Sequence, residues 1–210
     1  MTVYSGATEG SDYIDIRSYV PVYPENANAA HGLGGNDTIL GSAYADLLTG
    51  GEGNDLIYGY NGNDILVGDN GNDTLYGGNG NDSVLSGAGD DHLLGGAGND
   101  LMYGGTGNDI YYHYASEGVD TINDDKSEAG NTGYGGGTSD IVYFANVNLA
   151  NLGWAQPVGS NDLWLGTTAD LSDGVLSDGV VIQDFFLGGN NLVEWLVTAD
   201  NYSVNLASLL

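Results

Sequence analysis

Aspartate returns at every ninth residue through the middle of the chain, and this spacing has the clearest chemical meaning in the sequence. Between Gly32 and Tyr112 the chain divides into nine consecutive nine-residue units, from GLGGNDTIL to GGTGNDIYY. The sixth position is aspartate in every unit: Asp37, Asp46, Asp55, Asp64, Asp73, Asp82, Asp91, Asp100 and Asp109. The eighth position is always apolar or aromatic. Carboxylates repeated at one fixed place suit a hard cation such as Ca²⁺, which prefers oxygen ligands.

Glycine at fixed places predicts that each unit is a turn followed by a strand. Position one is glycine except at Ser86, and position four is glycine except at Tyr44. Glycine tolerates positive φ and lets backbone carbonyls converge. The last three residues of a unit, with one apolar side chain pointing inward, are expected to form only a brief strand. Two units make one coil, and stacked coils give two parallel sheets with strands about 4.8 Å apart. The predicted fold is all-β, a parallel β-roll or β-solenoid.

Coils of two units place the aspartates in two rows, one on each edge of the roll. The first row holds Asp37, Asp55, Asp73, Asp91 and Asp109, and the second holds Asp46, Asp64, Asp82 and Asp100. Stacked carboxylates at this spacing repel by about 3 to 4 kcal/mol per pair at an effective dielectric near 20. We therefore expect the chain to be unfolded without ions and folded once Ca²⁺ lies between successive turns. Neighbouring pairs give four sites in one row and three in the other, or about seven calcium ions. Magnesium fits less well, because it demands a tight octahedron and keeps its waters.

Composition excludes several functions. Acidic residues number 29 against two basic ones, for a formal charge of -27, and cysteine is absent. Nucleic acids and anionic membranes would be repelled, and disulfides and zinc thiolate sites cannot form. No apolar run approaches the roughly 18 to 20 residues of a membrane span. The opening residues Met1 to Ser5 lack the pattern of a cleavable signal peptide, so we expect either a cytosolic address or export by a route that ignores the N-terminus.

The nine units resemble the GGxGxDxUx nonapeptide of the RTX (repeats-in-toxin) family over residues 32 to 112. The resemblance implies a parallel β-roll, calcium in the turns and type I secretion through an uncleaved C-terminal signal. It implies as ligands the nine aspartates together with backbone carbonyls of the turn residues. For those carbonyls we take the position-four glycines: Gly35, Gly53, Gly62, Gly71, Gly80, Gly89, Gly98 and Gly107. Tyr44 departs from the pattern and is expected to alter its turn, whereas Ser86 is a milder change.

The flanks divide the chain into three parts. Residues 1–31 are predicted to be an N-terminal cap that contains half a unit around Asp12 and an insertion from Asp15 to Ala30; a disordered arm is the alternative. Residues 32–112 form the roll. Residues 113–210 hold degenerate turns around Asp120 and Asp140, a glycine-rich exposed loop between them, and a block from Asn161 to Leu196 that resembles the segment following RTX repeats. That block is expected to cover the open end of the roll and to lead into the secretion signal. Asp12, Asp120 and Asp140 are candidates for extra calcium sites.

The outward strand positions are unusually apolar. Position nine stacks Leu40, Tyr58, Tyr76, Leu94 and Tyr112 on one sheet, and Thr49, Val67, Leu85 and Tyr103 on the other. Self-association or partner docking is one explanation. High β-propensity is another, and cover by the N-terminal segment is a third.

Catalysis has little support in the sequence. The chain has neither HExxH nor GxSxG, so the zinc site of RTX proteases and the nucleophile elbow of RTX lipases are missing. His92 is expected to face outward. Trp154, Trp164 and Trp195 could stack on carbohydrate, but we expect them to pack in the core of the C-terminal block. We expect no enzymatic activity.

Two functions remain. The first is a secreted, calcium-folded structural or adhesive protein of a surface layer, matrix or filament, with self-assembly through apolar sheet faces or roll ends; it is favoured by a short chain that starts at Met1. The alternative is the C-terminal calcium-binding and secretion module of a larger RTX toxin, adhesin or hydrolase.

Overall fold

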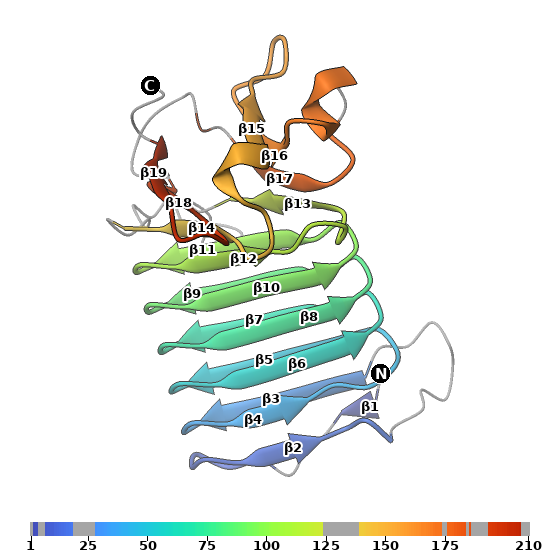
Figure 1. Cartoon of the computed structure of the whole chain (residues 1–210). Helices are drawn as coiled ribbons and strands as arrows, with labels where there is room; N and C mark the ends of the chain where they lie inside the picture. The colour runs from blue at the N-terminus through green and yellow to red at the C-terminus, as the bar shows by residue number, and fades with distance from the viewer. Residues whose placement is uncertain are drawn as a thin grey trace.

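Two parallel sheets face each other along the whole stack of coils (Figure 1). The computed structural model describes residues 2–3, 7–18, 28–123, 139–173, 176–183, 185 and 193–206. In Figure 1 the coils rise from β2 at one end to β13 and β14, above which the C-terminal strands lie. The predicted all-β β-solenoid is confirmed.

Odd-numbered strands make up most of one sheet, which we call sheet A. Its order is β1 (Thr2–Val3), β3 (Asn28–Gly34), β5 (Asp46–Glu52), β7 (Ile65–Asn70), β9 (Ser83–Ala88), β11 (Leu101–Thr106), β13 (Val119–Ile122), β17 (Gly179–Ile182), β16 (Leu163–Thr167) and β15 (Leu152–Ala155). Neighbours are parallel up to β17, and β17–β16 and β16–β15 are antiparallel.

Sheet B holds the remaining strands. Its order is β19 (Ser203–Asn205), β18 (Trp195–Thr198), β14 (Ile141–Phe144), β12 (Ile110–His113), β10 (His92–Ala97), β8 (Thr74–Asn79), β6 (Leu56–Asn61), β4 (Thr38–Leu40) and β2 (Tyr13–Asp15). Only β18–β19 is antiparallel. Two short 3₁₀ helices, η1 (Leu149–Asn151) and η2 (Asp170–Asp173), complete the described elements.

The register within the repeats is 18 residues, or two units. Leu48 pairs with Leu66 in sheet A, and Ile57 pairs with Leu75 in sheet B. The position-eight side chains therefore form a column between the sheets and are fully buried from Ile39 to Tyr111. The stacked position-eight side chains fill the narrow space between the two sheets. Each coil therefore adds the same layer to one continuous core.

The strands are longer than the expected three residues. β8, for example, runs from Thr74 to Asn79, so it covers positions seven to nine of one unit and one to three of the next. The expectation of a brief strand was wrong because the glycines after position nine keep pairing with the adjacent coil, as Gly78 does with Gly96. The turn itself consists of positions four to six, and the recurring aspartate lies at its end.

Strands outside the repeats continue both sheets. At the N-terminal end β2 pairs in parallel with β4, and β3 begins at Asn28, four residues before the first unit. At the C-terminal end β13, β14, β17 and β18 add further parallel strands. Most of the insertion between Asp15 and Ala30, the glycine-rich loop after Asn123, parts of the flanking block and the last four residues, where the secretion signal is expected, lie outside the described residues.

The outward positions stack as predicted. The position-nine residues of each sheet lie in register, and Tyr58 and Tyr76 stack with ring centroids 4.7 Å apart. His92 faces outward. Core packing of the tryptophans was wrong for Trp154, which is 54% exposed because it lies on β15, the edge strand of sheet A.

Candidate metal centres

Eight of the nine repeat aspartates lie at the last turn position, directly before a strand of the roll, and Asp46 is the first residue of β5. Asp55 precedes β6 and Asp64 precedes β7. Strands on either side of each turn pair with the neighbouring coils, so every aspartate lies over the one 18 residues earlier. The two predicted rows are therefore present, one on each edge.

One oxygen of each carboxylate is tied to the backbone of the neighbouring coil. The Oδ1 of Asp73 accepts the N–H of Asp55 at 2.7 Å, and the Oδ1 of Asp91 accepts the N–H of Asp73 at 2.7 Å. The second row repeats the pattern, with the Oδ1 of Asp82 accepting the N–H of Asp64 at 2.7 Å. These bonds fix the direction in which the other oxygen points.

The other oxygen has no donor. Eight of the nine repeat aspartates bury an Oδ2 atom without a hydrogen-bond partner: Asp37, Asp55, Asp64, Asp73, Asp82, Asp91, Asp100 and Asp109. All eight side chains are at most 3% exposed. A buried carboxylate oxygen without a partner is strongly destabilising, so these atoms call for a cation.

Burial raises the pKa of these carboxyl groups, although the backbone N–H donors act in the opposite direction. The pKa is about 6 for Asp55, Asp82 and Asp91, about 7 for Asp73, and about 8 for Asp64, Asp100 and Asp109. Burial also raises the pKa of Asp37 and Asp46. Without a neutralising cation, the rows would hold protons near neutral pH.

Position-one glycines leave room beside each free oxygen. A Cβ at Gly59 would overlap Asp64 Oδ2 and the carbonyl oxygen of Gly77 in the next coil. At Gly68 it would overlap Asp73 Oδ2 and the carbonyl oxygen of Ser86. Carboxylate and carbonyl oxygens thus converge on a space that only glycine leaves open. Ser86 departs from this rule, and its hydroxyl donates to the carbonyl of Gly104 at 2.8 Å.

The position-four carbonyls, predicted as ligands, stack along the turns. A Cβ at Gly71 would overlap the carbonyl oxygen of Gly53, and one at Gly98 would overlap that of Gly80. The same relation holds along both edges. Its members are Gly35, Gly53, Gly62, Gly71, Gly80, Gly89, Gly98 and Gly107, all with positive φ. The carbonyls that share the space of the free Oδ2 atoms belong instead to position one, which the sequence reasoning did not single out.

At three aspartates the second carboxylate oxygen, Oδ2, has a hydrogen-bond partner within the protein. Asp46 Oδ2 accepts the N–H of Ser42 at 2.6 Å, so the turn around Tyr44 closes without a positive φ. Asp12 Oδ2 accepts the N–H of Thr8 at 2.6 Å. Asp120 Oδ2 lies 2.9 Å from Nδ1 of His113.

Asp140 extends the first row beyond the repeats. Its Oδ1 accepts the N–H of Asp109 at 2.8 Å. Its own N–H donates to Oε2 of Glu194 at 2.8 Å, so a glutamate takes the next place in the row.

A second ladder lies at position five and was missed. The N–H of Asn54 donates to Oδ1 of Asn36, and the N–H of Asn99 donates to Oδ1 of Asn81. Position five is Asn or Asp in eight of the nine units, with Ala45 as the exception. That periodicity was the available signal. These asparagine side chains bond the turns of neighbouring coils to one another, and they do not use the Oδ2 atoms of the aspartates.

These features fit calcium. Ca²⁺ takes six to eight oxygens from carboxylates and carbonyls in flexible geometry, and both kinds of oxygen line the space beside position one. No group of three or more acidic, histidine or cysteine side chains that could hold a metal occurs among the described residues. Beside the free Oδ2 atoms, the backbone carbonyl oxygens of position one are further oxygens that could bind an ion. When bound, the ions would supply the positive charge that the rows lack.

Stacked turns with buried carboxylates on a parallel roll define a β-solenoid of the metal-binding kind. A family model of the RTX calcium-binding nonapeptide repeat, which spans four copies, matches residues 31–66, 58–93 and 76–113. Residues 31–113 therefore belong to the RTX calcium-binding nonapeptide repeats. No curated protein matches the chain. Within the described residues, no helix is long and apolar enough to cross a membrane.

Proposed function

We propose that this calcium-binding RTX protein is exported unfolded, folds when calcium outside the cell enters its turns, and serves there as a structural or adhesive component. The observation that carries the proposal is the set of eight buried Oδ2 atoms without a donor. The free energy of metal binding to such a set contributes directly to the free energy of folding, because the site does not exist in the unfolded chain.

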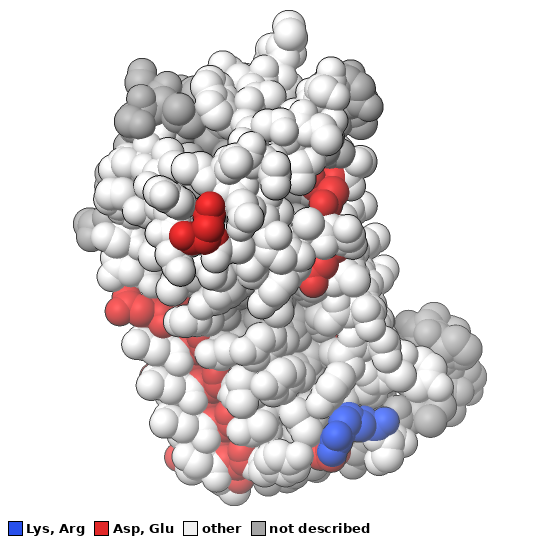
Figure 2. Space-filling view, in the orientation of Figure 1, with Lys and Arg blue, Asp and Glu red and all other residues white. Residues whose placement is uncertain are grey.

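Charge supports coupling of folding to calcium. The chain carries a net charge of -27, and Figure 2 shows a line of acidic atoms along one edge of the coils. The one described cationic side chain, Arg17, is already paired with Asp15 at 2.6 Å. Extracellular calcium modules bind with Kd values of about 10⁻⁴ to 10⁻³ M. Such affinities would leave the chain unfolded at low cytosolic calcium and able to pass through a type I exporter.

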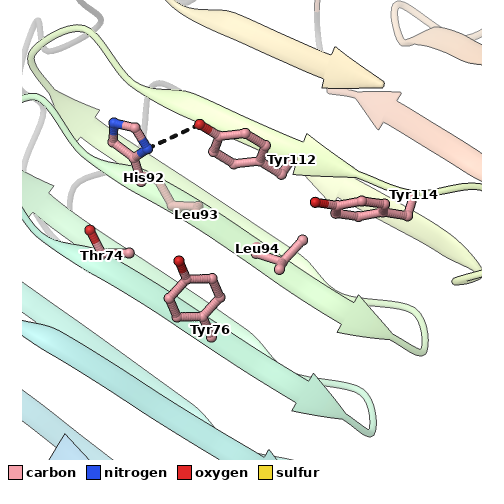
Figure 3. Close-up of a pocket in the computed structure, with 7 residues that line it drawn as sticks. All are labelled: Thr74, Tyr76, His92, Leu93, Leu94, Tyr112 and Tyr114. Atoms are coloured by element: carbon pink, nitrogen blue, oxygen red, sulfur yellow. Dashed lines mark hydrogen bonds between the residues drawn. The ribbon is translucent and has the colours of Figure 1, made fainter. Parts of the chain in front are cut away.

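The outer face of sheet B supports a surface role. A hollow of about 230 Å³ lies on it, lined by Thr74, Tyr76, His92, Leu93, Leu94, Tyr112 and Tyr114. Figure 3 shows Tyr76 and Tyr112 on opposite sides of Leu94, with the hydroxyl of Tyr112 bonded to His92. The lining contains no aspartate, glutamate, lysine or arginine. An uncharged aromatic surface on so acidic a protein favours contacts with another surface. No catalytic role is proposed.

A calcium titration followed by sizing tests the proposal. Circular dichroism in excess chelator should show little sheet, and the sheet signal should grow cooperatively as Ca²⁺ is added, with Mg²⁺ far less effective. Full sheet content in chelator would overturn calcium-coupled folding. Light scattering of the folded protein then separates the two roles: growth into large particles supports the structural role, whereas a monodisperse monomer favours the C-terminal module of a larger RTX protein.

A further inference from the structure

The second row of carboxylates has one member beyond the repeats, and its spacing is irregular. Asp120 follows Asp100 by 20 residues instead of 18, yet its Oδ1 accepts the N–H of Asp100 at 3.2 Å. The strands agree, since Leu101 pairs with Thr121. Asp120 is therefore the next rung after Asp46, Asp64, Asp82 and Asp100.

Histidine stands where the earlier coils have glycine. Leu94 pairs with Tyr112, so the next residue, His113, takes the place of Gly95 one coil later. Gly95 is the position-one glycine that faces Asp100. In the same way His113 faces Asp120, with Nδ1 2.9 Å from Oδ2. A carboxylate oxygen only accepts, so Nδ1 donates. The oxygen that is free on Asp64, Asp82 and Asp100 is thus held by an imidazole.

Two inserted residues make room for this side chain. In the regular coil a Cβ at Gly95 would overlap Asp100, and only two residues separate Gly95 from Gly98. Four residues separate His113 from Gly118, which aligns with Gly98 because a Cβ there would overlap the carbonyl oxygen of Gly98. The longer turn moves the backbone aside.

The widened turn is held by its own contacts. Asp178 Oδ1 lies 3.6 Å from Nε2 of His113, while its Oδ2 accepts the N–H of Ser116 at 2.8 Å. The His113 ring packs edge-on against Phe144 at 5.1 Å, and its side chain is 1% exposed. The imidazole is therefore fixed between two carboxylates in a closed site.

We infer that His113 takes the place of a calcium ion at Asp120, so that the second row of ions ends before this rung. The inference rests on the proposed calcium binding of the repeats. In physical terms, a buried N–H donor gives the second oxygen of the last carboxylate a hydrogen-bond partner, where the roll meets the C-terminal strands. The row of calcium sites thereby ends without leaving an incomplete, exposed site at its last aspartate.

The test is a count of bound calcium ions in a matched pair of variants, Asp120→Asn and Asp82→Asn, by equilibrium dialysis. Both variants remove one charge from the same row and keep the Oδ1 acceptor. Asp82→Asn should bind at least one ion fewer than the wild type, and Asp120→Asn should bind the same number as the wild type. Loss of an ion in Asp120→Asn would overturn the inference while leaving the proposed function intact. A wild type that binds no calcium would overturn the proposed function itself.

A second measurement serves if Asp120→Asn does not fold. In the calcium-saturated wild type, the Nδ1 proton of His113 should be visible in ¹H–¹⁵N spectra and exchange slowly with water, because it is buried against Asp120. An ion that displaced the imidazole would free this proton, and rapid exchange would then overturn the inference.

Discussion

The middle of the roll and its ends use the same aspartate in opposite ways. In the middle, each carboxylate gives Oδ1 to a backbone N–H and buries Oδ2 without a donor. At the ends, Thr8, Ser42 and His113 hold the second oxygen of Asp12, Asp46 and Asp120. The register is shared, so the neighbouring side chain or backbone decides whether a rung needs a cation. The roll thus has an ion-dependent centre, and ordinary hydrogen bonds hold the second oxygens of three aspartates toward its ends, Asp12, Asp46 and Asp120.

Filling the space beside a central aspartate should have the largest effect. In Gly68→Ala the new Cβ would overlap Asp73 Oδ2 and the Ser86 carbonyl oxygen. We expect the free energy of unfolding in saturating calcium to fall by about 3 kcal/mol, the upper part of the range for overpacking, measured by urea denaturation. The control is Gly10→Ala at the N-terminal end, whose Cβ meets only Thr8 Oγ1 at 3.8 Å. Equal stability of the two variants would contradict the close approach of the Asp73 and Ser86 oxygens to Gly68.

Removing the charge of one central aspartate and of one aspartate near the end should change stability in two different ways. Asp73→Asn should lose stability by about 1.4 to 2.7 kcal/mol at calcium 10- to 100-fold above Kd, and the loss should grow with calcium concentration. Asp46→Asn should lose about 1 kcal/mol from its bonds to Ser42, independent of calcium. Thermal unfolding over a calcium series measures both. A calcium-dependent loss in Asp46→Asn would erase the distinction.

Acid should favour the ion-free roll and weaken calcium binding. The carboxyl pKa values of the rows are raised by burial to about 6 at Asp55 and about 8 at Asp64, against about 3.9 in the unfolded chain. A raised carboxyl pKa stabilises the ion-free fold fully below about pH 4, and this contribution is lost as pH rises through 6 to 8. Calcium competes with these protons for the carboxylates, but protons and calcium both stabilise the folded chain over the unfolded one, so the calcium concentration at the folding midpoint should fall as pH falls from 8 to 6. Titrations followed by circular dichroism at both pH values measure this, and an unchanged midpoint would count against the buried rows.

The smallest expected effect lies at the N-terminal end, where Leu33 has φ 77° and is 50% exposed. The equivalent position one coil later is Gly51. Leu33→Gly should raise stability by up to about 1 kcal/mol, because the left-handed region costs other residues about 1 to 2 kcal/mol and glycine gives back part of this in unfolded-state entropy. Leu33→Ala keeps the strained φ and should bring no gain. Thermal unfolding in saturating calcium compares the two, and equal gains would show that strain is not the cause.

The repeat by itself determined the roll, the two rows of aspartates and the buried position-eight column. A strict nine-residue period allows one stacking register, and a slip of two residues would place Asp37 or Asp55 where Ile39 or Ile57 must pack. The period made Asp46 a predicted calcium ligand, and degenerate turns made Asp12 and Asp120 candidates for extra sites. The period could not indicate that Thr8, Ser42 and His113 contact the second oxygens of these three aspartates, because those partners are not part of the repeat pattern.

Only the tertiary structure decided which oxygens are left without a donor. Hydrogen bonds between coils join residues 18 or more positions apart, such as Asp55 and Asp73, and their direction is set by backbone geometry that composition does not encode. Contacts such as that of His113 with Asp178 join segments 65 residues apart in the chain. No local spacing predicts them, because they exist only once the C-terminal strands have packed onto the last coil.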